Sequence, residues 1–352
     1  MTTMSKSDDL SGQHPTMHHV AALAGVSIKT VSRVINNEPN VSPDKASRVW
    51  TAAQRLNYQP NIQASNLKRS HRRSQTLGLL VGSVANPFSG AIHRAVEDVA
   101  RTYGAEVFSA SLDDDPNRER SIVEAFVRRR VDGLILTTAT KSQAYLGVEQ
   151  QHGTPLVFVD REPIGISADA VVSDNRRGAF RAVQHLIHHG HRRIAYLGDC
   201  STIQTARERR LGFLDALSAQ KISVSDTVIV EDLHDAESAY EACQRLLRED
   251  TPPTALFTSQ NLVTFGALRA LRKHGCHNSV ALVSFDDFLL SDLLEPGVTV
   301  IAQNPRKIGT LAAERMFARL QGDQSPEETF VVPTVLIPRG SGEIHPIDST
   351  KS

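Results

Sequence analysis

Residues Met17–Asn37, MHHVAALAGVSIKTVSRVINN, match a helix-turn-helix template, and no other feature constrains the fold of this chain as strongly. Ala21 stands where two helices cross so closely that only a small side chain fits. Gly25 stands in the turn, where the backbone must be left-handed, a conformation that glycine adopts without steric cost. Val31 seats the second helix on the first, and the other buried positions follow at helical spacing: Val20, Ala24, Val26 and Val34.

The second predicted helix begins with a capping residue and an exposed polar end. Ser27 can cap this helix through its side-chain oxygen, ahead of the exposed run Ile28-Lys29-Thr30. In helix-turn-helix proteins this end enters the DNA major groove. An ordinary helical hairpin is the alternative, but seven constrained positions match the template together. The segment therefore predicts DNA binding.

Charge is distributed unevenly along a chain whose formal net charge is zero. Residues 1–74 hold 10 Lys and Arg against 4 Asp and Glu, and the remainder holds 29 against 35. A basic head on an acidic body fits DNA binding through the head, because phosphate contacts supply most non-specific affinity.

Cysteine usage and the N-terminal sequence indicate a cytoplasmic protein. Cys200, Cys243 and Cys276 are odd in number and lack CxxC spacing, so we interpret them as buried thiols in a reducing compartment. We expect no disulfide, no metal site and no cofactor. No signal peptide or membrane span is visible. Polar residues 1–15 are expected to be disordered, as is the tail after about Gly342.

A helix-turn-helix domain over residues 16–61 and a hinge over 62–74 are predicted next. A helix is expected over 44–56, and Pro60 in the segment that follows stops this helix. Residues 62–69 are too short and too polar to form a stable helix alone, and Arg69, Arg72 and Arg73 follow them. We interpret this segment as a hinge that orders on binding; a plain linker is the alternative.

From Gln75 the pattern alternates between strands and helices, which predicts parallel sheets covered by helices on both faces. About 270 residues are too many for one such sheet with its helices, so two similar lobes are expected. Ligands of these sheets bind beyond the carboxyl ends of the strands, at loops such as 85–88, 160–161 and 286–287. The strand-like runs are Thr76–Val84, Ala105–Ala110, Gly133–Thr138, Leu156–Asp160, Ala170–Ser173, Arg193–Gly198, Val228–Val230, Ala255–Thr258 and Val280–Phe285, and helical patterns include Ser89–Tyr103, Asn117–Arg130, Arg176–His189, Thr205–Ala219 and Leu262–His274.

Several blocks between about Thr16 and Gly340 resemble the LacI/GalR family of bacterial transcription regulators. The most specific is the helix-turn-helix block, followed by Leu56-Asn57-Tyr58-x-Pro60-Asn61. The supporting blocks are Asn86-Pro87-Phe88, Val131-Asp132-Gly133-Leu134-Ile135, Arg209-x-x-Gly212-Phe213, Gly266-Ala267, Phe285-Asp286-Asp287 and Thr299-Val300-Ile301-x-Gln303.

The resemblance implies a homodimer that binds a palindromic operator, with one recognition helix in the major groove of each half-site. Ile28, Lys29 and Arg33 would approach bases, and Leu67, with Ala64 on the same helical face, would wedge into the minor groove. Packing of Leu67 on its dimer mate is an alternative that can hold alongside the wedge. Phosphate contacts would come from Thr16, Ser27, Thr30, Ser32 and Asn36.

The resemblance also implies an α/β fold class: a three-helix head, a hinge helix, and a two-lobed periplasmic-binding-protein-like body over 75–342. The N-lobe would comprise about 75–172 and 304–332, and the C-lobe about 173–303 and 333–342. A small polar effector would bind between the lobes. The cleft residues would be Asn86, Phe88, Asp160, Arg209, Gln260, Phe285, Asp286 and Gln303.

This residue set suits a polyhydroxylated ligand. Carboxylates accept hydroxyl protons, Arg209 donates to neighbouring oxygens, and Phe88 or Phe285 can cover the apolar side of a ring. An ion pair that packs the lobe is the alternative role for Arg209. The ligand would be a sugar or a related metabolite, with a nucleoside or cyclitol as alternatives. The regulator would be a repressor, with an activator or a corepressor-dependent regulator as alternatives.

The chain departs from the family pattern at three places. His18-His19 replaces the usual acidic residue before Val20, Ser259-Gln260-Asn261 replaces Ala-Asn-Asp, and no tryptophan follows Asp287. Adjacent histidines point in different directions on a helix, which argues against a metal site there. An enzyme is not expected, because GxSxG, GxGxxG, GxxxxGK and HExxH motifs are missing. A sugar-binding receptor would leave the basic head without a purpose.

Overall fold

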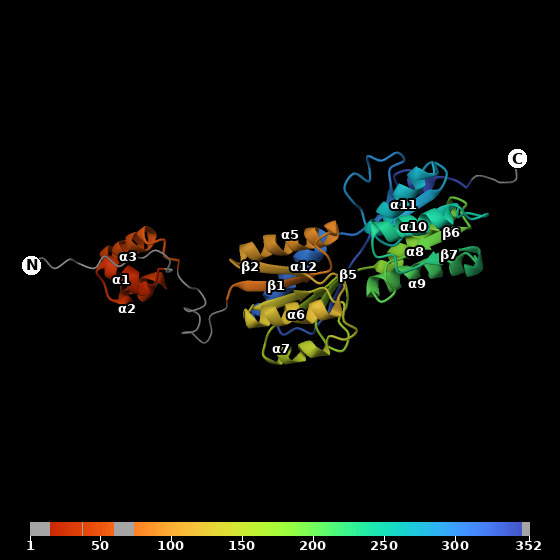
Figure 1. The fold of residues 1–352 in the computed structure, drawn as a ribbon. Coiled ribbons are helices and arrows are strands. Elements are labelled where there is room, and N and C mark those ends of the chain that lie inside the picture. The colour runs from red at the N-terminus through yellow and green to blue at the C-terminus, as the bar shows by residue number, and fades with distance from the viewer. Residues whose placement is uncertain (1–14, 37, 60–73, 347–352) are drawn as a thin grey trace, which may run out of the picture. The chain divides into compact units, whose positions relative to one another are not determined.

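The computed structural model describes residues 15–36, 38–59 and 74–346. The chain divides into two compact units, residues 1–74 and 75–352, which we call the head and the body. Figure 1 shows the three helices of the head and the layered lobes of the body. The expected hinge positions Ala64 and Leu67 lie outside the described residues, as do residues 1–14. No helix in the described part is long and apolar enough to cross a membrane.

The head is a three-helix unit built from α1 (Met17–Ala24), α2 (Ile28–Ile35) and α3 (Pro43–Arg55). Alanines at the helix contacts keep the three helices close together. The predicted helix-turn-helix is therefore present, with a third helix completing its core. That core consists of Val20, Ala21, Ala24, Val31, Val34, Val49, Ala52 and Ala53.

The turn between α1 and α2 has the backbone that the sequence predicts. Gly25 adopts φ 62°, in the left-handed region. A Cβ at this position would lie 2.7 Å from Nη2 of Arg48, which donates to the carbonyl of Ala24 at 2.6 Å. The Ser27 side chain accepts from the backbone N–H of Thr30 at 3.2 Å and so caps α2. Glycine is required here for φ, whereas the Arg48 guanidinium ends a flexible side chain that can shift.

The N-lobe of the body is a six-stranded parallel sheet in the order β11-β5-β4-β3-β1-β2. Its strands are β1 (Thr76–Val81), β2 (Glu106–Ser111), β3 (Gly133–Leu136), β4 (Leu156–Val159), β5 (Asp169–Ser173) and β11 (Thr329–Val332). Two separate apolar clusters fill the spaces between this sheet and its helices. Helices α5 (Pro87–Thr102) and α12 (Pro305–Leu320) cover one face, and α6 (Pro116–Arg128), η1 (Ala144–Leu146) and α7 (Gly147–Gln151) cover the other.

The C-lobe repeats this plan in the order β12-β10-β9-β8-β6-β7, with β12 antiparallel to β10 and the other pairs parallel. Its strands are β6 (Ile194–Leu197), β7 (Val228–Val230), β8 (Ala255–Thr258), β9 (Ala281–Phe285), β10 (Thr299–Ala302) and β12 (Val335–Ile337). Helices α8 (Asn175–His188) and α9 (Gln204–Ala219) pack on one face, and α10 (Ala236–Leu246) and α11 (Asn261–Lys273) on the other. Short 3₁₀ turns are η2 (Val224–Asp226) and η3 (Ser341–Glu343).

The chain crosses between the lobes three times, after β5, after β10 and after β11. The α/β fold class predicted from the strand–helix alternation is confirmed. Strands β10, β11 and β12 are not among the strand-like runs that the sequence predicts. After β10 the chain enters the N-lobe with α12 and β11 and returns to the C-lobe with β12, so residues 305–337 contribute to both lobes.

Candidate functional sites

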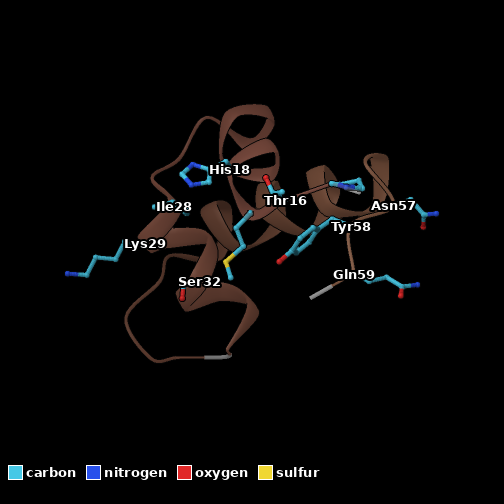
Figure 2. A pocket seen from close by; sticks show the side chains of 10 residues that line it. Thr16, His18, Ile28, Lys29, Ser32, Asn57, Tyr58 and Gln59 are labelled. Carbon is cyan, nitrogen blue, oxygen red and sulfur yellow. The ribbon is translucent and has the colours of Figure 1, made fainter. Parts of the chain in front are cut away.

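The exposed surface of α2 carries the side chains expected to reach DNA bases. Ile28 is 40% exposed, and Lys29 and Arg33 are also exposed. Figure 2 shows Lys29 extending away from the ribbon beside a hollow that is also lined by Thr16 and Ser32. The start of α1, the first turns of α2 and residues 57–59 therefore share one face of the head.

Other residues expected to contact DNA make hydrogen bonds or ion pairs within the head. Asn36 Nδ2 donates to the Ser32 carbonyl at 2.8 Å. Oγ of Ser27 lies 2.9 Å from Oγ1 of Thr30, and Nε of Arg33 lies 3.9 Å from Oε2 of Glu38 at the surface. These bonds orient side chains that the sequence assigns to phosphates or bases.

His19 explains one departure from the family pattern. Its Nδ1 accepts the backbone N–H of Thr16 at 3.2 Å. An acidic side chain three residues into a helix commonly makes this reciprocal contact in a capping box. The histidine therefore performs the capping task without the negative charge, and no metal role is needed to account for it.

A cavity of about 230 Å³ lies between the two lobes of the body. Its lining comes from the loops beyond the carboxyl ends of strands in both sheets, as parallel sheets predict, and from the first turns of α5, α9 and α11. Seven of the eight expected cleft residues line it: Asn86, Phe88, Asp160, Arg209, Gln260, Asp286 and Gln303.

Arg209, Asp286 and Gln303 form a connected polar group on the C-lobe side. Gln303 Nε2 donates to Asp286 Oδ1 at 2.6 Å, and Nη1 of Arg209 lies 4.0 Å from Asp286 Oδ2. Arg209 also donates to the Asn175 side-chain oxygen at 2.8 Å and to the Ser259 carbonyl at 2.6 Å. The guanidinium is thus held in place while it lines the cavity.

Phe285 does not line the cavity, so its expected role in covering a ligand ring is wrong. Its side chain is fully buried in the C-lobe core. The Arg209 guanidinium carbon lies 3.9 Å from the centre of the Phe285 ring, a stacking contact that supports the cation. Every residue of β9 is buried. The sequence position of Phe285 next to Asp286 therefore does not show whether its ring faces the cavity or the core.

Two carboxylates end equivalent strands in strained backbone conformations. Asp160 follows β4 with φ 69°, and Asp286 follows β9 with φ 74°. Few non-glycine residues adopt this region, although Asp and Asn do so more often than most, and residues held there recur at binding sites. Burial raises the pKa of Asp160 against the opposing charges of Arg161 and Arg209. A ligand hydroxyl or cation beside Asp160 would replace solvation that this carboxylate has lost.

Asn86 joins the two lobes across the cavity. Its side-chain oxygen accepts the backbone N–H of Phe88 at 3.0 Å and the Asn261 side-chain amide at 3.0 Å. A second bridge runs from the Glu162 backbone N–H to the Gln204 side chain at 2.8 Å. Both are neutral hydrogen bonds between the lobes, and a ligand in the cavity can replace them with hydrogen bonds of its own.

Sequence reasoning missed several polar residues of the same cavity, including Asp113, Asp114, Asp199 and His234, and it placed Arg161 only in a ligand-binding loop. Arg161 Nη2 pairs with Asp114 Oδ1 at 2.6 Å, and Gln260 Nε2 donates to Asp199 Oδ2 at 2.9 Å. Each missed residue lies in a loop that follows a strand. That rule, applied to β2, β6 and β7 as well, would have found them.

The three cysteines are free, but they differ in burial. Cys243 is buried, whereas Cys200 and Cys276 are only partly buried. Burial, with the charges of Asp199, Asp232 and Asp114, raises the pKa of Cys200 to about 11. The interpretation of all three as buried thiols therefore fails at Cys200 and Cys276.

Comparison with known families identifies both parts of the chain. Residues 16–61 match the model of bacterial regulatory proteins of the lacI family, and residues 183–342 match a periplasmic binding protein-like domain. The GalR transcriptional regulator of Salmonella typhimurium strain LT2 is 33% identical over 328 residues, covering 93% of this chain and 95% of its own.

Solved structures agree with this assignment. The lac repressor dimer bound to operator and the anti-inducer ONPF superposes with a TM-score of 0.80 at 26% identity, covering 94% of this chain and 99% of its own. A complex of the transcriptional regulator CelR with cellobiose superposes with a TM-score of 0.67 at 29% identity, covering 93% of this chain and 100% of its own.

Proposed function

Because the chain belongs to the LacI family of bacterial transcriptional regulators, we propose that a small polar effector in the body cavity controls operator binding by the head. The chain is a DNA-binding transcriptional regulator, and its relatives are regulators rather than enzymes, as the sequence predicts. The cavity carries this proposal, because seven residues expected from the family pattern line a single space between the lobes.

The head would read DNA through α2. Ile28, Lys29 and Arg33 are exposed on this helix and would face the bases, with Lys29 suited to guanine acceptors. Thr16, Ser27, Thr30, Ser32 and Asn36 would contact phosphates. Selection of bound duplexes from a random pool should return a palindrome, and recovery of sequences without two related half-sites would contradict this part of the proposal.

The effector would be a sugar or a sugar-like metabolite. Asp160 and Asp286 supply acceptors, Arg209, Gln260 and Gln303 supply donors, and the partly buried Phe88 offers an apolar face. Cellobiose bound to the related CelR supports a carbohydrate. Nucleosides and cyclitols satisfy the same groups and belong in the same screen.

Thermal melting with a panel of monosaccharides, disaccharides, nucleosides and cyclitols tests the effector class. A ligand at 100 times its Kd stabilises the folded protein by about 2.7 kcal/mol, which raises the melting temperature measurably. The D286N variant should lose this shift. The matched D215N variant should keep it, because Asp215 pairs with Arg176 at the surface outside the cavity. A shift unchanged in D286N would place the ligand elsewhere.

We also infer that the body forms a homodimer in the cytoplasm, where the DNA lies. Leu289, Leu290 and Leu293, in the segment after β9, are 86%, 55% and 72% exposed. Adjacent exposed leucines commonly mark a protein interface, and the related lac repressor is a dimer on its operator. Light scattering should give twice the chain mass for the wild type and a lower mass for L289D/L293D. A monomeric wild type would contradict this inference.

Control by the effector would operate through the lobes. A ligand that prefers one lobe arrangement shifts the balance by its differential affinity. A change from 1:99 to 99:1 needs about 5.5 kcal/mol, or about 2.7 kcal/mol at each of two sites in a dimer. Exchange of the Asn86–Asn261 bridge for ligand contacts is one structural route to that preference.

A further inference from the structure

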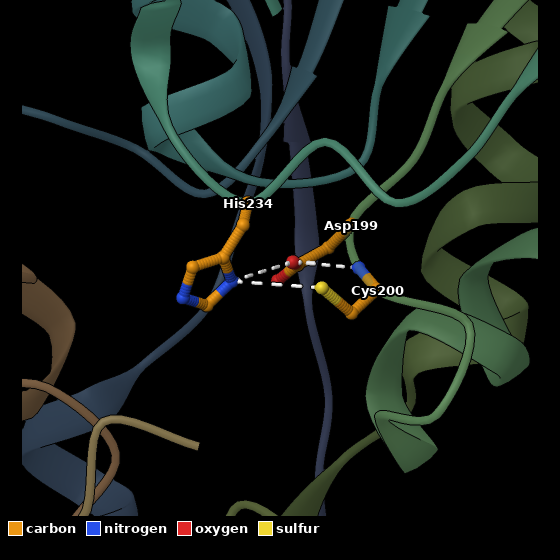
Figure 3. Close-up of side chains that lie close together, drawn as sticks. All are labelled: Asp199, Cys200 and His234. Carbon is orange, nitrogen blue, oxygen red and sulfur yellow. Dashed lines mark hydrogen bonds and ion pairs between the residues drawn. The ribbon is translucent and has the colours of Figure 1, made fainter. Parts of the chain in front are cut away.

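Three side chains with different metal-binding chemistry meet in the C-lobe (Figure 3). Nδ1 of His234 lies 3.5 Å from Asp199 Oδ1 and 3.7 Å from Cys200 Sγ. Their ligand atoms all lie within 4.8 Å of one another, and no other group of three such residues in the described segments does so. Because β6 and β7 are parallel neighbours, the loops after them bring together residues 34 positions apart.

The spacing of these atoms fits one tetrahedral ion. Zinc lies about 2.3 Å from sulfur and about 2.0–2.2 Å from nitrogen or oxygen. Tetrahedral angles then place sulfur about 3.6 Å from nitrogen, and nitrogen about 3.4 Å from oxygen. The corresponding observed distances are 3.7 Å and 3.5 Å. Both distances from His234 Nδ1 therefore match one tetrahedral ion, and the third pair, Cys200 Sγ and an Asp199 carboxylate oxygen, lies within 4.8 Å.

The surroundings also favour a cation. The carboxylates of Asp114, Asp199 and Asp232 all add negative potential at the Cys200 sulfur. Asp199 Oδ2 accepts from Gln260 Nε2 at 2.9 Å, and Oδ1 accepts from the Cys200 backbone N–H at 2.7 Å, which holds Oδ1 beside His234 Nδ1. Outer partners of this kind orient metal ligands and raise affinity.

We propose that Asp199, Cys200 and His234 bind a zinc-class divalent cation in the C-lobe wall of the cavity. One thiolate, one imidazole and one carboxylate suit zinc or cobalt and not magnesium or calcium, which prefer oxygen ligands. Binding forms the metal–sulfur bond as the Cys200 thiol releases its proton to solvent.

Three protein ligands leave one position of a tetrahedral ion open. Asp199 and His234 line the cavity, whereas Cys200 does not, so the open position is on the cavity side. A hydroxyl of a bound effector can occupy it, a role that rests on the proposed effector function. Bound metal should then strengthen effector binding.

Cobalt titration of the full chain, without effector, tests the metal site. Wild-type protein should develop thiolate-to-cobalt charge-transfer absorption, and added zinc should remove it. The C276S variant should behave like the wild type, since Cys276 is partly buried but outside the cluster. The C200S variant should show no such absorption. H234A loses a direct ligand and should bind cobalt more weakly than the wild type by more than the roughly 10–100-fold that loss of an outer partner costs.

No thiolate absorption in the wild type, or absorption that persists in C200S, would overturn the site. Two histidine ring pairs, His185–His189 and His189–His345, offer nitrogen ligands without sulfur elsewhere in the C-lobe. Binding without the thiolate signal would therefore also count against the proposal. The shift in melting temperature caused by the effector should be larger with zinc than with a chelator. Equal shifts would overturn coordination of the effector on the cavity side. The cobalt titration contains no effector, so its result is independent of the effector proposal.

Discussion

Replacement of Arg209 by alanine should destabilise the body and abolish the effector response. Arg209 and Asp286 are each 7% exposed, so solvent screens their interaction little. Loss of the arginine leaves Asp286 as a buried charge without its cation, although Gln303 still donates to it, and removes the donors to Asn175 and Ser259. Breaking a buried pair in this way costs about 3–5 kcal/mol of unfolding free energy.

Urea unfolding followed by far-ultraviolet circular dichroism measures this cost in the body. The single tryptophan, Trp50, lies in the head and reports head unfolding separately through its fluorescence. The matched R207A variant, on the exposed side of the same helix, should lose less than about 1 kcal/mol. A loss below about 1 kcal/mol in R209A would refute the role of Arg209 as a buried cation.

The conservative R209K variant separates stability from function. Lysine keeps a positive charge but cannot donate in two fixed directions or stack in the same way, so about 1.5–3 kcal/mol should be lost. The folded variant should bind operator normally but fail to respond to the effector identified by melting. An unaltered response would remove Arg209 from the effector site.

Three further predictions concern the head, the helix packing and acid stability. K29A should relax base preference in a selected operator; uniform weakening across sequences would contradict its placement. G212A should cost about 3 kcal/mol of unfolding free energy, because the new Cβ would lie 2.1 Å from the Arg176 carbonyl oxygen. The control G90A has open space at the new Cβ and should stabilise the protein slightly. Equal urea midpoints for the two variants would contradict this prediction. D169N should cost about 3–5 kcal/mol at pH 7, and a cost unchanged at pH 3 would contradict the paired carboxylate.

The direction of the pH effect follows from the surroundings of Asp169. Burial raises its pKa, but hydrogen bonds from Arg319, Arg315 and the Glu328 backbone N–H outweigh burial and hold the pKa below its usual value. Ionised Asp169 therefore makes its full contribution to the unfolding free energy above the ordinary pKa near 4. This contribution is lost as the pH falls through the lower pKa of the folded state. The stability difference between wild type and D169N should shrink over that range.

Local sequence signals predicted the head and most strands well. The turn at Gly25 and the cap at Ser27 depend on neighbouring residues, so a single stretch of sequence contains the information. The α/β alternation predicted the lobes for the same reason. Strands β11 and β12 escaped because they have several exposed residues and lie at sheet edges, where the apolar pattern is weak.

The cavity was predicted less completely because it depends on which side chains face inward. Arg209 and Asp286 were found through motif blocks, but Phe285 points into the core, where it supports the arginine. The contact of Asp199 and Cys200 with His234 arises from neighbouring loops of different strands. The strand-end rule finds Asp199 and His234 one at a time, but no spacing in the sequence shows that the three residues meet.

The affinity of the selected operator, measured by fluorescence anisotropy at fixed salt with and without a saturating effector, tests the central claim most directly. Ligand occupancy of the cavity should change the operator Kd by at least 10-fold, about 1.4 kcal/mol, and D286N should show no such change. An operator Kd that stays the same when melting shows the cavity to be filled would contradict the control of the head by the body.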